Sequence, residues 1–387
     1  MTTVLVASVI AAKCGNGGNA RAVLNWLEGL IKLGVQAYYV EQIASRHCTG
    51  DRGETVPFAE SANVAYFEHV MGEAGLTRAS ALVCDDGPET RGLRYRELLD
   101  VAEAADLLLN ISGHLTLEPL MRRIRRKAYL DLDPGFTQFW HAVGNDAARV
   151  SGHDFHFTIG ENIGTPGCGI PCGGIRWRHT RQPALLVDDV GAPAPWTGRF
   201  TTIASWRGPY GPVQHGDTTL GLKVHEFRKL IDLPRRAPAR FEIALDIHPA
   251  DARDLRLLCD HGWRLVDPRG VAADPRSFDE YIQHSDAECS AAQGIYVATN
   301  SGWFSDRTVR YLAAGKPVLV QDTGFSRTLP VGDGVIAFRS VDEAVRGVDA
   351  IQREPRRHQQ AARALAAEFF DSNQVIGRLL DEAGVAA

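Results

Sequence analysis

The stretch SGWFSDRTVRYLAAGKPVLVQDT, residues 301–323, predicts a loop, a helix, a tight turn and a strand, in that order. Residues 301–307 have the polar and glycine content of a loop, and residues 308–314 place their apolar side chains on one side of a helix. Gly315 and Pro317 end that helix, because glycine adopts a left-handed cap and proline cannot continue the turn. The apolar run at 318–320 is typical of a buried parallel strand.

A loop that leads into a helix is a favourable place for a phosphate group. It presents free backbone N–H groups and the positive end of the helix dipole. Hydroxyl groups and a guanidinium in the same loop would add hydrogen bonds and positive charge. The residues predicted to bind a diphosphate-bearing donor here are Ser301, Gly302, Ser305, Asp306, Arg307 and Thr308.

The helix, the Gly-Lys-Pro turn and the strand resemble the nucleotide-sugar signature of GT-B glycosyltransferases. This resemblance implies an α/β chain with two Rossmann-like domains facing each other across a cleft, the second of which binds the sugar nucleotide. Retaining members often carry Glu-Gly-Phe-Gly and then a second Glu before the turn. Here residues 302–305 replace the first four, and Arg310 stands at the second Glu. Asp306 is the nearest acid that could hold the ribose hydroxyls, as the second Glu does in the family.

Length and composition describe a globular chain. Its 387 residues are enough for two domains, and 44% are hydrophobic and 23% charged. The net charge of −5 argues against a general nucleic-acid partner. No apolar run is long enough to cross a membrane, and the N-terminus lacks the basic segment of a signal peptide, so we expect a cytoplasmic protein. The seven cysteines show no zinc-site spacing, and we expect neither a metal nor a cofactor.

The N-terminal segment predicts a β-α-β unit with a glycine-rich first turn. A strand at 4–11 is followed by a loop and then by a helix at 20–33. The loop residues Gly15, Asn16, Gly17, Gly18 and Asn19 would let the backbone approach a ligand closely, although a plain tight turn is the alternative. The resemblance implies that this loop faces the donor phosphate or the acceptor. It lacks the histidine that many inverting members carry there, which favours retention of configuration.

Two further predicted strands end in residues that could perform chemistry. The strand at 105–111 leads to His114, and the strand at 126–132 leads to Asp133. Ligands of open α/β sheets collect at the carboxyl ends of strands, so both are candidate catalytic residues. Asp131 is an alternative to Asp133 as a base, or a partner to it in a metal pair, and a turn cap is the structural alternative.

In the second half, a strand at 200–206 is followed by Arg207 and later by Lys223. These resemble the Arg and Lys that hold the donor diphosphate in retaining members, although surface charges are the alternative reading. A departing nucleoside diphosphate needs such cations. We also expect a strand at 294–298, and a helix at 353–370 with His358 on its exposed side.

The predicted organisation is an acceptor domain at 1–187, a linker at 188–198, a nucleotide-sugar domain at 199–360, and helices at 361–387 that cross back to the first domain. The expected function is transfer of a sugar from a nucleoside-diphosphate sugar, a co-substrate, to a hydroxyl of a small molecule or saccharide. A sugar-nucleotide 2-epimerase and a non-catalytic nucleotide- or sugar-binding protein are the alternatives. The acceptor and the oligomeric state stay open.

Overall fold

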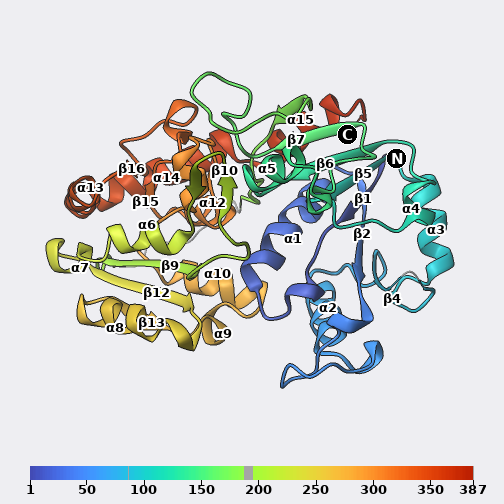
Figure 1. Ribbon diagram of the computed structural model, residues 1–387, viewed down its shortest axis with the longest axis horizontal. Coiled ribbons are helices and arrows are strands. Elements are labelled where there is room, and N and C mark those ends of the chain that lie inside the picture. Colours follow the sequence, from blue (N-terminus) through green and yellow to red (C-terminus); the bar gives the residue numbers. More distant parts are fainter. Residues whose placement is uncertain (86, 187–194, 387) are drawn as a thin grey trace.

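The computed structural model describes residues 1–85, 87–186 and 195–386, and its strands form two large sheets (Figure 1). The strand orders are β4-β3-β2-β1-β5-β6-β7-β8 and β13-β12-β9-β14-β15-β16. Every pairing described in these two sheets is parallel apart from β3 with β4, which agrees with the alternation of strands and helices along the chain. Most of the predicted linker at 188–198 lies outside the described residues.

The first sheet is built from the N-terminal half of the chain. Its central strands are buried along their whole length, because helices cover both faces. The strands are β1 (Thr3–Ala7), β2 (Gln36–Ile43), β3 (Ser80–Cys84), β4 (Thr90–Gly92), β5 (Leu107–Ile111), β6 (Lys127–Asp131), β7 (Phe155–Thr158) and β8 (Trp177–His179). One face packs against α1 (Gly17–Lys32), α2 (Ala62–Glu73) and α15 (Ser372–Glu382), and the other against α3 (Tyr95–Ala104) and α4 (Glu118–Met121).

The second sheet follows the same plan. Its strands are β9 (Arg199–Ser205), β12 (Arg240–Asp246), β13 (Arg264–Val266), β14 (Ala287–Ser290), β15 (Val318–Gln321) and β16 (Val335–Phe338). One face carries α6 (Lys223–Lys229), α7 (Leu233–Arg236), α8 (Ala252–Asp260) and α13 (Val341–Arg353). The other carries α10 (Pro275–Gln283), α12 (Asp306–Ala313) and α14 (Pro355–Phe369). The short helix α9 (Pro268–Val271) follows β13.

The element order predicted for 301–323 is confirmed by α12, a left-handed Gly315 with φ 68°, and β15. Two expectations elsewhere are wrong. Residues 294–298 form helix α11 (Gly294–Ala298), and the strand is β14 just before it, because a short apolar run can be buried in either form. His358 is not on the surface but only 3% exposed, and its ring accepts a hydrogen bond from the Gly334 N–H at 3.2 Å.

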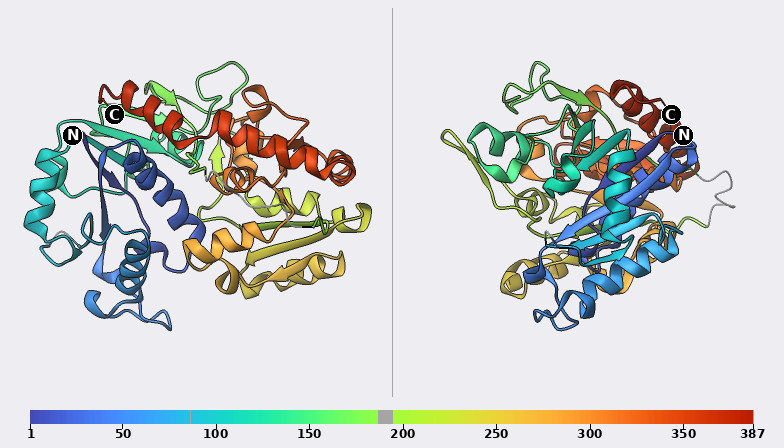
Figure 2. Two further views of the ribbon diagram at one scale, coloured as in Figure 1. Left: turned by 180° about the vertical axis from the view of Figure 1, so that it is seen from behind. Right: turned by 90° about the vertical axis from the view of Figure 1, so that its right-hand side faces the viewer.

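The last helix returns to the first sheet. Ile376 and Leu379 of α15 lie in the same apolar core as Trp26 and Leu30 of α1. The Thr2 hydroxyl donates to the Ala386 carbonyl at 2.7 Å, and the two ends of the chain lie side by side (Figure 2). Among the described residues, no helix is long and apolar enough to cross a membrane.

The two halves also meet through a shared apolar cluster. The hairpin of β10 (Val213–His215) and β11 (Thr218–Leu220) extends from the second half onto α5 (Phe136–Ala142) of the first. Val213 and Ile295 pack with Phe136 and Ile163 in one buried group. The loop at 160–174 adds backbone hydrogen bonds, among them Asn162 N–H to the Ser301 carbonyl at 3.1 Å. These contacts fix how the two sheets face each other.

Candidate functional site

A large cleft of about 1290 Å³ lies between the two sheets, at the carboxyl ends of their strands. The first half contributes the ends of β1, β5 and β6, and the second half contributes the ends of β9, β12 and β13. This is where open α/β sheets bind ligands. A second hollow of about 740 Å³ opens beside the cleft in the first half. The residues that line both are Val9, Lys13, Ser112, His114, Asp133 and Tyr210. The two spaces therefore share a junction.

Asp133, a predicted catalytic residue, lies at this junction and is held from the opposite half. Its carboxylate accepts hydrogen bonds from the Tyr210 hydroxyl at 3.3 Å and the Tyr296 hydroxyl at 3.2 Å. Burial raises the pKa of the Asp133 carboxyl, while the charge of Lys13 and the two tyrosine hydroxyls act in the opposite direction. A carboxylate with a raised pKa is a better proton acceptor near neutral pH. The geometry therefore suits a general base.

Asp131 is not an alternative base. It is fully buried and accepts hydrogen bonds from the side chains of Thr137 at 2.8 Å, Gln138 at 2.7 Å and Thr158 at 2.7 Å. Burial raises the pKa of its carboxyl to about 6. It lines neither the cleft nor the second hollow, so it joins β6, β7 and α5 as a structural residue.

His114, the other predicted catalytic residue, also lines the junction. Burial, together with the charges of Lys13 and Arg149, lowers the pKa of its imidazole to about 3. The ring is therefore neutral across the ordinary pH range and is a poor proton acceptor. It can still donate or accept a hydrogen bond with a bound sugar or acceptor. Asp133 is the stronger candidate for the base.

The glycine-rich turn has a different form from the predicted loop, because α1 begins at Gly17 and not at residue 20. Gly17 N–H donates to the Ala272 carbonyl of the second half at 2.9 Å. A Cβ added at Gly17 would lie 2.0 Å from the Asp274 carbonyl oxygen, and one at Gly18 would lie 2.9 Å from the Phe278 ring. These two glycines let the start of α1 dock on α10, as Figure 1 shows.

The other residues of this turn face the cleft more openly. Gly15, Asn16, Gly18 and Asn19 line it, whereas Gly17 does not. The Asn16 side chain caps α1 by accepting the Asn19 N–H at 3.0 Å. The Asn19 side chain in turn accepts the Lys13 ammonium at 3.1 Å. Gly17 therefore does not face the cleft as predicted; it forms a contact between the two halves.

A buried carboxylate that the sequence analysis missed holds the turn that carries Lys13. Glu41 of β2 accepts the backbone N–H groups of Ile10 at 2.8 Å, Ala11 at 2.8 Å and Ala12 at 2.7 Å, and the Tyr39 hydroxyl at 2.9 Å. The available signal was a single acidic residue in the segment 36–43, whose other residues are uncharged. Glu41 positions the chain at the end of β1.

Lys223 and Arg207 both line the cleft from the second half, as predicted for a donor site. Lys223 opens α6, and burial lowers the pKa of its ammonium to about 7, with the charge of Arg307 adding to the effect. Arg207 is bound by Asp251, with Nε–Oδ2 at 2.9 Å, and its side chain is 55% exposed. The charge of Lys223 therefore depends more on a ligand than that of Arg207, because a bound anion would favour the protonated form of its amine.

The start of α12 reaches the cleft through Asp306 and Arg307. No side chain caps α12, so its first amide groups are available to an anion. The Arg307 guanidinium is already occupied: it donates to Glu288 at 2.7 Å, to the Ile203 carbonyl at 2.7 Å and to the Ser290 hydroxyl at 2.6 Å. Its positive charge would attract an anion in the cleft, but its hydrogen bonds to β9 and β14 fix the position of the side chain.

Four predicted donor-binding residues lie outside the cleft: Ser301, Gly302, Ser305 and Thr308. The loop turns inward instead, because Gly302 N–H donates to the Thr323 carbonyl at 2.9 Å and the buried Ser301 hydroxyl accepts the Trp303 N–H at 3.2 Å. Arg310, at the place of the family's second Glu, points to α10 and pairs with Asp279 at 2.7 Å.

The cleft has an apolar wall that the sequence did not reveal. Ile247, Leu265 and Val266 line it after β12 and within β13. Each of these residues belongs to a short segment whose sequence pattern predicts burial. Such a pattern does not show that the side chain faces a ligand site. A flat heterocycle would fit against such a wall.

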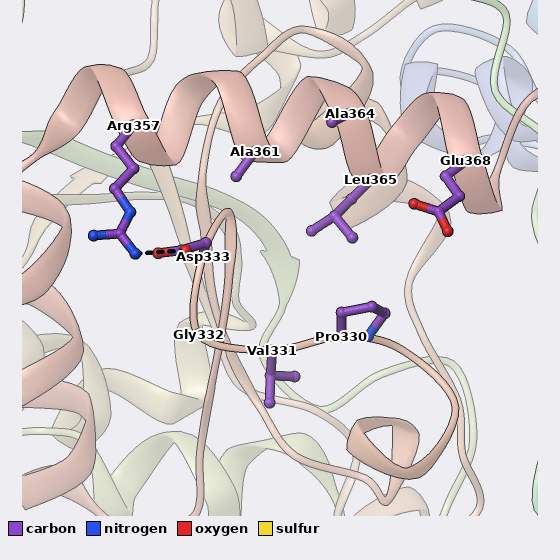
Figure 3. A pocket seen from close by; sticks show the side chains of 9 residues that line it. All are labelled: Pro330, Val331, Gly332, Asp333, Arg357, Ala361, Ala364, Leu365 and Glu368. Atoms are coloured by element: carbon purple, nitrogen blue, oxygen red, sulfur yellow. Dashed lines mark hydrogen bonds and ion pairs between the residues drawn. The ribbon is translucent and has the colours of Figure 1, made fainter.

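A separate hollow of about 560 Å³ lies away from the cleft, between α14 and the loop before β16 (Figure 3). Arg357 and Asp333 close one end with an ion pair at 2.8 Å, and Val331 and Leu365 form its middle. Arg357 and Asp333 pair with each other and Glu368 lies at the opposite end, so the hollow presents no convergent polar groups to a ligand. It is not a candidate active site.

Comparison with known proteins gives matches among solved structures, whereas no family model and no curated protein matches the chain. HepE from Anabaena in complex with UDP-glucose has a TM-score of 0.60 at 12% identity, over 99% of this chain and 100% of that chain. An alpha-glucosyltransferase with UDP and a 13-mer DNA gives 0.59 at 11%, over 99% and 100%. The pneumococcal O-GlcNAc transferase GtfA with UDP and GlcNAc gives 0.55 at 8%, over 99% and 98%.

The chain has the GT-B fold. The resemblance read from residues 301–323 is confirmed at the level of the fold. In GT-B terms, the two sheets are the two Rossmann-like units, and the cleft between them is the space in which the candidate residues above meet.

Proposed function

We propose that the protein transfers a sugar from a nucleoside-diphosphate sugar to an acceptor hydroxyl. The observation that supports this most is the junction of two spaces at Asp133, one between the halves and one within the first half. Transfer needs room for a donor and for an acceptor, with a proton acceptor between them. An epimerase needs only the donor space, so the second hollow favours transfer.

The donor would bind with its diphosphate near Lys223 and the uncapped start of α12, and its base against the apolar wall at Ile247 and Val266. Asp306, at the first position of α12, is the acid placed to hold the ribose. The neighbours named above contain UDP or UDP-glucose, which supports a uridine nucleotide as the first ligand to test. We propose no metal or cofactor, because Lys223, Arg207 and the helix start supply positive charge to the leaving diphosphate.

In the proposed reaction, the acceptor oxygen forms a bond to the anomeric carbon, and the bond from that carbon to the diphosphate oxygen breaks. Asp133 takes the proton of the acceptor hydroxyl, and the nucleoside diphosphate leaves with the bonding electrons. A single displacement with Asp133 as base inverts the anomeric centre, whereas the missing loop histidine favours retention, so the anomeric proton coupling of the product would distinguish the two outcomes.

Binding of UDP is expected to raise the melting temperature of the protein, and Lys223→Met should weaken binding by about tenfold or more, because a charge-assisted contact is lost. Calorimetric titration with UDP, dTDP, GDP and ADP would measure this. Lys229→Met is the matched control, since Lys229 lies on the same helix but pairs with Glu226 at 2.7 Å. Absence of binding by every nucleotide, or equal losses in both variants, would argue against the donor site.

The affinity for UDP is expected to fall as the pH rises above 7. The pKa of Lys223 is lowered to about 7 in the free protein, so its protonated, anion-binding form becomes scarce at higher pH. We expect binding to be roughly tenfold weaker at pH 8.5 than at pH 7, with uptake of a proton on binding. Titrations in buffers of different ionisation enthalpy would detect the proton. In Lys223→Met both effects should disappear, and a flat profile in the unaltered protein would contradict the prediction.

A further inference from the structure

The second hollow carries more positive than negative charge. The acidic, basic and histidine side chains that line it are Lys13, Arg46, His47, Asp85, His114, Asp133 and Arg149. With histidines neutral, three cations face two carboxylates there, although the whole chain carries a net charge of −5. Asp85 is already engaged, because it accepts the Ser45 N–H at 2.9 Å. The excess of positive charge is therefore a local feature of this hollow.

Arg149 lines the second hollow and has an uncommon backbone conformation. It lies in the left-handed region, with φ 50° and ψ 25°, at the end of the single turn Asp146–Ala148. Such residues cluster at sites where the surrounding structure imposes a position. A Cβ added at Gly113 would lie 2.7 Å from the Arg149 Cβ, so only a glycine there allows Arg149 to sit against the loop that carries His114.

The Arg149 guanidinium has no hydrogen bond or ion pair with any described residue, unlike Arg207 and Arg307 on the donor side. Its charge and that of Lys13 both act on the His114 ring, and both residues line the second hollow. Trp140 and Tyr210 form an aromatic wall there, with ring centroids 4.9 Å apart. The hollow thus offers cations, an aromatic surface and the Asp133 carboxylate.

We propose that the acceptor is a small molecule with a carboxylate or phosphate group, which Arg149 and Lys13 bind while its apolar body lies against Trp140. This deepens the proposed function and rests on it. Arginine suits such a group, because its planar fork binds both oxygens of one anion. A volume of about 740 Å³ fits a small molecule, and the chain's net negative charge disfavours a long polyanion such as nucleic acid.

The test uses the full chain with saturating UDP and three probes of similar shape: 4-hydroxybenzoate, phenyl phosphate and the neutral 4-hydroxybenzamide. We expect calorimetry to show at least one anion binding about tenfold more tightly than the amide, and the tighter anion identifies the group. Arg149→Gln should remove this preference, whereas Arg149→Lys should keep part of it. Arg357→Gln, whose arginine pairs with Asp333 away from the cleft, is the control and should behave as the unaltered protein.

Equal binding of the amide and both anions, or an undiminished preference in Arg149→Gln with an unchanged melting temperature, would overturn the proposal. A DNA duplex that binds through Arg149 while the small anions do not would overturn it as well. UDP is titrated separately. If UDP fails to bind but the anions bind through Arg149, the donor assignment is the part that falls. If UDP binds and the anions show no preference, only the acceptor inference falls.

Discussion

Replacing Asp133 by asparagine is expected to reduce sugar transfer about a thousandfold while leaving the affinity for UDP within about threefold, because general-base catalysis contributes on that scale and Asp133 lies beyond the proposed diphosphate contacts. The amide keeps the shape of the carboxylate but cannot accept a proton. The measurement is the initial rate of UDP release from UDP-glucose, with and without 4-hydroxybenzoate, together with a calorimetric titration of UDP.

The two tyrosines that bind Asp133 provide a graded comparison. Tyr210→Phe and Tyr296→Phe should each lower the rate by only about tenfold, because each removes one hydrogen bond that orients the base. The rate should also decline on the acid side at a higher pH than for an ordinary aspartate, since burial raises the pKa of Asp133 and protonation removes the base. A variant Asp133→Asn that keeps more than a tenth of the rate would exclude this role.

Replacing Glu41 by alanine is expected to lower the free energy of unfolding by about 3–5 kcal/mol, because three buried or half-buried N–H groups and the Tyr39 hydroxyl lose their shared acceptor. The lost bonds hold the turn before Lys13, so the affinity for UDP or acceptor should weaken as well. Urea-induced unfolding followed by circular dichroism would measure the change in stability.

Glu68 supplies the control for this experiment. It lies on α2 of the same half, its side chain is 58% exposed, and its nearest cation, Arg91, is 3.8 Å away. Glu68→Ala should change the stability by no more than about 0.5 kcal/mol. Glu41→Gln should fall between the two, since it keeps one acceptor oxygen. If Glu41→Ala and Glu68→Ala unfold at the same urea concentration, the turn is held by other contacts.

The sequence predicted the fold well where the signals are local. Helix period, a left-handed Gly315 and a short apolar run are properties of neighbouring residues, and they were sufficient for α12 and β15. The run at 294–298 failed for the same reason: five apolar residues do not say whether they are buried as a helix or a strand. In the structure this run packs against Gly221, which is distant in the sequence and whose carbonyl accepts the Ile295 N–H at 3.2 Å.

Site residues were predictable only where the end of a strand fixes their place. Asp133 and His114 follow buried strands, and both reach the junction. Ser301 and Gly302 were misplaced, because their loop turns toward Thr323 and Asn162, a contact that no local pattern records. Arg149 had no signal at all, since its position depends on the absence of a side chain at Gly113.

The return of α15 to the first sheet has a consequence for biosynthesis. Residues 375–385 complete the apolar core that covers β1 and β2, and Thr2 bonds to Ala386. While the ribosome is still adding residues, the N-terminal half therefore lacks part of its core. Although domains often fold in order as they emerge, the core of this one is complete only after α15 has emerged from the ribosome. A premature stop before α15 would expose the surface of α1 and damage the first half, not the half that was truncated.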